Sequence, residues 1–110
     1  MGRVVWTDQA VGDLTAIMDY IARDSPRYAL QTGERIYNAA GRLNLGIRSG
    51  AMVPEFNLDI FREVLARPYR VIYEIRDEHC YVVAVIHGSR DLPRHVRPPE
   101  ESPKGPGSAS

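Results

Sequence analysis

The chain has 110 residues, a formal net charge of +0 and 44% hydrophobic residues, a composition typical of one globular domain. The zero net charge argues against bulk nucleic-acid binding, which depends on a clear excess of cations, and the single cysteine excludes an internal disulfide. No apolar run approaches the roughly 20 residues that span a bilayer, and the first residues lack the apolar stretch of a signal peptide. We therefore expect a cytoplasmic protein.

The beginning of the chain predicts a short strand followed by a helix. Residues 3–6 are rich in β-branched and aromatic residues, as strands are. Thr7 can then cap a helix whose apolar residues recur at three- and four-residue spacing as far as Ile21. This helix ends before Pro26, because the residue that precedes a proline avoids the helical conformation.

A second helix is predicted to begin at Ser25 and Pro26, a capping residue followed by proline at the first helical position. It runs toward Leu45, where Gly46 is expected to stop it. The short connection between the helices indicates an antiparallel hairpin. The packing face of the second helix is predicted to consist of small and apolar residues: Ala29, Gly33, Ile36, Ala40 and Leu43.

Three strands are predicted near residues 60–66, 69–76 and 80–87, after a loop over residues 46–59. The tight connection at residues 77–79 joins the last two strands into a hairpin. The middle strand alternates apolar and charged residues, which predicts one solvent-facing side. The last strand is apolar almost throughout, which is typical of a central strand covered on both faces.

The predicted order β-α-α-β-β-β describes an α+β domain over residues 1–97, with a helical hairpin packed on one face of a mostly antiparallel sheet. We expect the opposite face to be concave and polar and to carry Arg62 and Arg70. Residues 98–110 are rich in proline, glycine and serine and predict a disordered tail. The three histidines lack the clustering of zinc ligands, and we expect neither a metal nor a cofactor.

Several segments between residues 3 and 93 occur in a characteristic order. They are the opening VVWTDQAVGDLTAIMDYIA, the helix start at Ser25-Pro26, and the later YRVIYEI and VIHGSRDLP. This set resembles the RelE/ParE superfamily of bacterial toxins from type II toxin–antitoxin systems. The resemblance implies one of two activities, because RelE-like members cleave messenger RNA on the ribosome whereas ParE-like members poison DNA gyrase. It also implies a partner antitoxin that neutralises the toxin.

The resemblance assigns catalytic groups for the case of a RelE-like nuclease. Glu55 matches the general base, and Arg62 and Arg70 match the arginines that grip phosphate. His87 is placed to act as the general acid. Each residue also has an ordinary structural explanation: a solvated loop carboxylate, a cross-strand ion pair or packed stem for the arginines, and a hydrogen-bonded histidine at a strand end.

Departures from the nuclease pattern favour the ParE-like interpretation. The last strand ends in the segment HGSRD at residues 87–91 with no following tyrosine, and Lys104 is the only lysine. We therefore expect a gyrase inhibitor that binds its target and is not an enzyme, with a ribosome-dependent mRNA endonuclease as the alternative. The expected contacts with gyrase are arginines of the strands and of the segment that follows them: Arg62, Arg70, Arg90, Arg94 and Arg97.

Apolar residues beside the packing faces of the two helices suggest a surface for the antitoxin. They are Met18, Tyr20, Leu30 and Tyr37. An amphipathic segment of a ParD-like, ribbon-helix-helix antitoxin could lie on them, which implies a toxin–antitoxin hetero-oligomer. The alternative is that these residues only widen the core of the hairpin. A degenerate toxin fold kept as a regulatory partner or decoy is a third interpretation of the whole chain.

Overall fold

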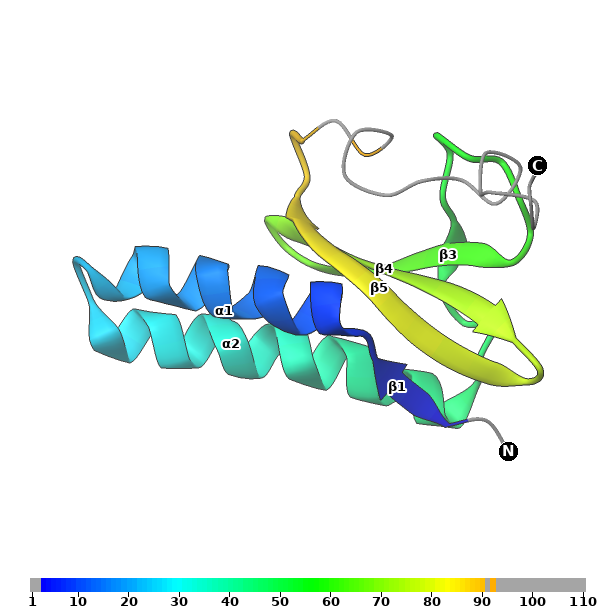
Figure 1. Cartoon of the computed structure of the whole chain (residues 1–110), viewed down its shortest axis with the longest axis horizontal. Helices are drawn as coiled ribbons and strands as arrows, with labels where there is room; N and C mark the ends of the chain where they lie inside the picture. The colour runs from blue at the N-terminus through cyan, green and yellow to red at the C-terminus, as the bar shows by residue number, and fades with distance from the viewer. Residues whose placement is uncertain (1–2, 91, 93–110) are drawn as a thin grey trace.

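The computed structural model describes residues 3–90 and Leu92, and it consists of a helical hairpin packed on a five-stranded sheet (Figure 1). The predicted α+β class is confirmed. The elements are β1 (Val4–Trp6), α1 (Asp8–Ala22), α2 (Pro26–Gly41), the 3₁₀-helix η1 (Arg42–Leu45), β2 (Ala51–Met52), β3 (Phe61–Ala66), β4 (Tyr69–Arg76) and β5 (His79–His87). No described helix combines the length and the apolar character that crossing a membrane requires.

The sheet has the strand order β1-β5-β4-β3-β2. β1 pairs with β5 in parallel, and the other neighbouring strands are antiparallel. β5 therefore lies between two strands, in agreement with its apolar sequence. The three predicted strands and the final hairpin are confirmed, but the expected loop over residues 46–59 contains the two-residue strand β2, which is too short to show an alternating pattern.

Local capping explains why the helices begin where the sequence predicts. Thr7 Oγ1 accepts a hydrogen bond from the Ala10 N–H (3.2 Å), and Ser25 Oγ accepts one from the Tyr28 N–H (3.1 Å). The predicted stop at Gly46 is also confirmed, although the last turn before it tightens into η1. These signals lie within a few residues of the boundaries that they set.

The two helices approach closely at Gly33 of α2. A Cβ atom on this residue would lie 2.6 Å from Sδ of Met18 on α1, so the Met18 side chain would have to move to accommodate a larger residue. The packing face predicted for the second helix is buried as a whole: Ala29, Gly33, Ile36 and Ala40 in α2 and Leu43 in η1.

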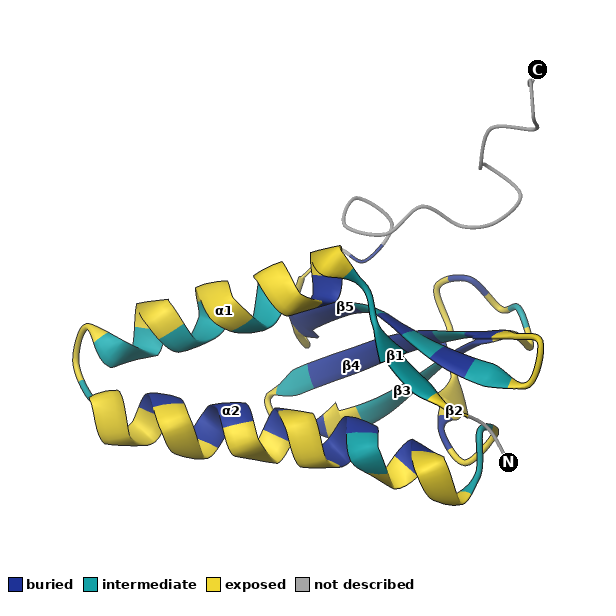
Figure 2. Ribbon diagram, turned by 60° about the horizontal axis from the view of Figure 1, so that its bottom comes forward, coloured by how far each residue is buried: buried dark blue, intermediate teal, exposed yellow. Residues whose placement is uncertain are grey.

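The sheet face away from the helices is only partly polar, so the prediction of a concave polar face that carries both Arg62 and Arg70 is wrong in part. The hairpin covers one face, and on the other face Phe56 and Leu92 pack with residues of β3, β4 and β5 in a second apolar cluster. Figure 2 shows buried residues along β4 and β5. The register also separates the two arginines that were expected together: Arg62 pairs with Tyr73 and Arg70 pairs with Leu65, which puts them on opposite faces.

Candidate functional site

Arg70 lies at the centre of a cluster of two carboxylates on the sheet face away from the helices. Its Nη1 and Nη2 atoms each donate a hydrogen bond to Glu55 at 2.8 Å, and its Nε donates to Glu63 Oε1 at 2.6 Å. Arg70 is only 9% exposed. Because both edges of the guanidinium are engaged by carboxylates, Arg70 has little capacity left to grip a phosphate.

The same contacts change the acidity of the cluster. The hydrogen bonds from Arg70 are the main reason that the pKa of Glu55 lies below its usual value, and burial opposes this effect only in part. The hydrogen bonds that Arg70 donates to Glu55 are likewise the main reason that the pKa of Arg70 is raised. A general base works best with a pKa near the working pH, so this ionised, doubly bonded Glu55 carboxylate is a poor base.

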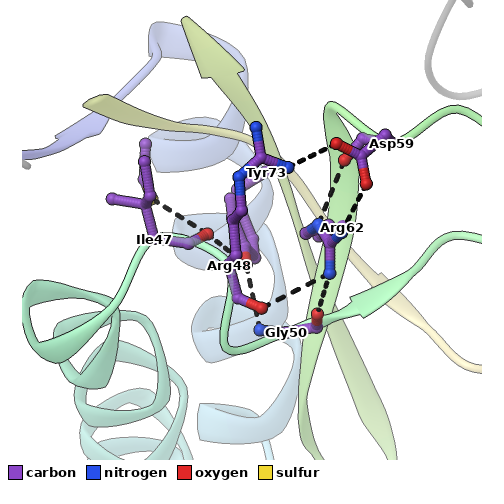
Figure 3. Close-up of polar contacts among 7 residues, drawn as sticks. Ile47, Arg48, Gly50, Asp59, Arg62 and Tyr73 are labelled. Carbon is purple, nitrogen blue, oxygen red and sulfur yellow. Dashed lines mark hydrogen bonds and ion pairs between the residues drawn. The ribbon is translucent and has the colours of Figure 1, made fainter. Parts of the chain in front are cut away.

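Arg62 belongs to a second polar cluster, on the helix side of the sheet (Figure 3). It donates from Nε to Asp59 O (3.0 Å), from Nη2 to Asp59 Oδ1 (2.6 Å), and from Nη1 to Gly50 O (2.9 Å). Asp59 also forms an ion pair with Arg48, and the two arginines are the main reason that its pKa is lowered. Arg62 thus joins the loop before β2 to the start of β3.

Tyr73 and Gly50 complete this second cluster (Figure 3). The buried Tyr73 hydroxyl donates to Ile47 O (2.8 Å) and accepts from the Gly50 N–H (3.1 Å), while burial raises its pKa. A Cβ atom on Gly50 would lie 2.5 Å from Glu63 O and 2.7 Å from the Tyr73 hydroxyl. The path of residues 47–50 therefore depends on a tyrosine, an arginine and a glycine.

His87 ends β5 and carries a local network. Its ring meets Tyr69 edge to face at 5.7 Å, and its Nδ1 accepts the Ser89 N–H (3.2 Å) and lies 2.9 Å from Ser89 Oγ. His87 and Arg70 line one hollow of about 510 Å³. The structure thus brings together three residues of the nuclease hypothesis, Glu55, Arg70 and His87, and leaves Arg62 on the other face.

The expected gyrase contacts fall in different environments. Arg62 and Arg70 are held by carboxylates as described above. Arg90 is exposed and lines a small pocket of about 170 Å³ between α1 and the end of β5. Arg94 and Arg97 lie outside the described residues. These contacts remain predictions.

The residues of this chain that were expected to contact the antitoxin also lie in different environments. Met18 is half-buried against Gly33, between the helices. Leu30 and Tyr37 are 63% and 60% exposed and lie two turns apart on one face of α2, where Tyr37 stacks on Trp6 at 5.9 Å. Tyr20 is exposed on α1, with the Arg23 guanidinium 5.5 Å from its ring centre. Leu30 and Tyr37 therefore fit an apolar partner best.

Sequence reasoning missed Asp13, whose Oδ2 accepts a hydrogen bond from the Val85 N–H (2.9 Å) and so joins α1 to β5. It also missed three arginines that converge between α2 and β3, namely Arg35, Arg42 and Arg67. The seven-residue spacing of Arg35 and Arg42 places them on one helix face, and this spacing could have been recognised in the sequence. Within the described ranges, no three metal-binding side chains are grouped as a metal site requires.

Comparisons with known proteins identify a family, a relative and a structure of similar fold. Residues 4–92 match the family described as ParE toxin of type II toxin–antitoxin system, parDE. The chain is 33% identical over 90 residues to Toxin RelE2 of Caulobacter vibrioides. The aligned region covers 82% of this chain and 99% of that protein. A solved structure described as the chromosomal ParDE TA system from P. aeruginosa is similar in fold, with a TM-score of 0.67 at 24% identity, over 79% of this chain and 96% of that chain.

Proposed function

Because the chain belongs to the ParE toxin family of type II toxin–antitoxin systems, we propose that it acts in the cytoplasm as an inhibitor of DNA gyrase. On this proposal it is a binding protein and not an enzyme. It would hold gyrase in one conformational state by binding that state more tightly than the others.

One observation carries the choice of gyrase over messenger RNA: the bidentate pairing of Arg70 with Glu55. In a nuclease of the RelE type these two groups would be the phosphate grip and the base. In this protein Arg70 and Glu55 are hydrogen-bonded to each other, so neither is available for that role. The lowered pKa of Glu55 weakens it further as a base. The separation of Arg62 onto the other face argues in the same direction.

The second candidate is a ribosome-dependent mRNA endonuclease. The similarity to a relative named Toxin RelE2 supports it. On this alternative, Glu55, Arg62, Arg70 and His87 would carry the chemistry. It requires the pair between Glu55 and Arg70 to open when RNA binds.

The test compares both targets with one purified preparation. We expect micromolar protein to abolish supercoiling by gyrase and to leave protein-linked DNA breaks, while messenger RNA on translating ribosomes stays intact. Glu55→Gln should keep this activity, because the proposal gives Glu55 no chemical role. Codon-dependent cuts in messenger RNA together with normal supercoiling would overturn the proposal, and loss of those cuts in Glu55→Gln would establish the alternative.

We also propose a ParD-like antitoxin whose amphipathic C-terminal segment covers Leu30 and Tyr37. Replacing both residues by glutamate should weaken antitoxin binding at least about tenfold, because two exposed apolar anchors are lost. The double change Thr15→Glu and Gln31→Glu adds the same charge at other exposed helix positions and should leave binding unaltered. Equal affinity for both double variants would place the antitoxin elsewhere.

A further inference from the structure

Three arginines line a groove between α2 and β3. Arg35 and Arg42 come from the helical side and Arg67 from the end of β3, around a hollow of about 500 Å³. Its floor includes the buried Ala39 and Ala66, and Leu65, 41% exposed, borders it. The groove is therefore cationic at its rim and apolar at its base.

The groove arginines have no anionic partner among the described residues. Ion pairs within that part of the chain are formed by Arg48, Arg62, Arg70 and Arg76. In the groove, Arg35 donates from Nη1 to a backbone oxygen, Arg67 O, at 2.9 Å, which leaves its charge uncompensated. Three like charges on one hollow favour an incoming carboxylate.

The edge of β3 is open beside this groove. β2 pairs with β3 only at Arg62 and Glu63, and β3 is the last full-length strand on this side of the sheet. The bond from the Val53 N–H to Phe61 O shows that the odd-numbered residues of β3 direct their backbone groups outward. The N–H and C=O of Leu65 therefore face outward beyond the end of β2, where an added strand can pair with them.

We propose that this groove binds an acidic segment of a partner protein in extended conformation. The segment adds to β3 beside Leu65 and directs its carboxylates to Arg35, Arg42 and Arg67. A polynucleotide would satisfy the guanidinium groups but would leave the sheet edge and the apolar floor unused. Helix geometry places Arg35 roughly 140° around α2 from Leu30, so this surface is separate from the one proposed for the antitoxin.

The probe is a short peptide of alternating glutamate and valine, titrated into the full-length protein and followed by amide NMR. We expect saturable shifts around the groove and slowed hydrogen exchange of the Leu65 amide, because this N–H becomes part of a strand ladder. The double variant Arg42→Glu and Arg67→Glu should weaken binding roughly tenfold or more through charge reversal. Arg27→Glu, an exposed position on the same helix outside the groove, should bind the peptide as the parent does.

Two further ligands distinguish strand pairing with a peptide from binding that depends on charge alone. A peptide that is N-methylated at every residue has no N–H group to donate to the strand edge, and its methyl groups hinder close pairing. It should therefore lose the protection of Leu65 and most of the affinity. Single-stranded oligothymidylate of the same charge should bind more weakly than the peptide. The proposal is overturned if the oligonucleotide binds as tightly through the same arginines, or if Arg27→Glu weakens peptide binding as much as the groove variant does. Thermal unfolding of each variant confirms that it is folded.

Discussion

The arginines of the sheet and the arginines beside α2 differ in what surrounds them. Arg62 and Arg70 are largely buried and each forms an ion pair: Arg70 donates to two carboxylates, and Arg62 donates to one carboxylate and to backbone oxygens. Arg42 and Arg67 are exposed and have no ion-pair partner within the described residues. The ion pairs of Arg62 and Arg70 therefore stabilise the fold. The arginines that are available to a partner lie at positions that the sequence pattern did not single out.

The energetic consequence of this difference is large. Removing one member of a buried ion pair leaves an uncompensated charge and costs about 3–5 kcal/mol, whereas an exposed charge contributes at most about 1 kcal/mol. Substitutions in the two groups should therefore separate effects on folding from effects on binding.

The largest effect is expected for Arg70→Met. This change leaves the Glu55 and Glu63 carboxylates close together without a cation, so we expect a loss of about 3 kcal/mol in the free energy of unfolding. Urea denaturation measures it. The matched change Arg42→Met should stay within about 0.5 kcal/mol of the parent. Similar losses in both variants would remove the distinction between the two groups.

The second cluster is tested by Gly50→Ala. The added methyl would press on Glu63 O and the Tyr73 hydroxyl, and neither a backbone oxygen nor a buried ring can move away cheaply. We expect a loss of about 2 kcal/mol. Gly12→Ala on α1 is the control, because a Cβ atom there meets nothing within 4 Å, and it should raise stability by about 0.5–1 kcal/mol. Stabilisation by both changes would show that the loop before β2 is not held as described.

Thr32 extends the comparison to an unpaired polar group that is buried. Its hydroxyl has no hydrogen-bond partner among the described residues, and the residue is fully buried in α2. Thr32→Val replaces this hydroxyl by a methyl group of similar size, so we expect a gain of about 1 kcal/mol. Thermal or urea unfolding measures this gain, and Thr15→Val, exposed on α1, should change little. A loss of stability at position 32 would mean that water or another group satisfies the hydroxyl.

Much of the fold was predictable because its signals are local. Thr7 and Ser25 cap the helices within their own turn, and the alternation of β4 identifies a strand without knowledge of its neighbours. The placement of Arg62 and Arg70 was not predictable in the same way. Alternation gives the two faces of each strand, but only the register between strands decides which faces coincide.

The candidate site was predicted less well for a related reason. The partners of Arg70 come from β3 and from the loop before it, and the path of that loop depends on Phe56 and Leu92 packing beneath it. Such contacts join distant parts of the chain, and no spacing in the sequence reveals them. The arginine groove is an intermediate case, because the spacing of Arg35 and Arg42 was visible whereas their convergence with Arg67 required the fold.

The smallest expected effect is a change in how stability depends on pH, and it concerns Glu55. Its pKa in the folded protein lies below the ordinary value of 4.5, so its ion pair contributes stability above about pH 4.5 that is lost as the pH falls through the lower folded pKa. Glu55→Gln should therefore flatten the decline of unfolding free energy with acidification below pH 4.5. Glu34→Gln, at an exposed position of α2, should decline as the parent does. If the unfolding free energies of the parent and of Glu55→Gln declined equally below pH 4.5, Arg70 would not hold this carboxylate in solution. Glu55 and Arg70 would then be available for the nuclease role argued against above.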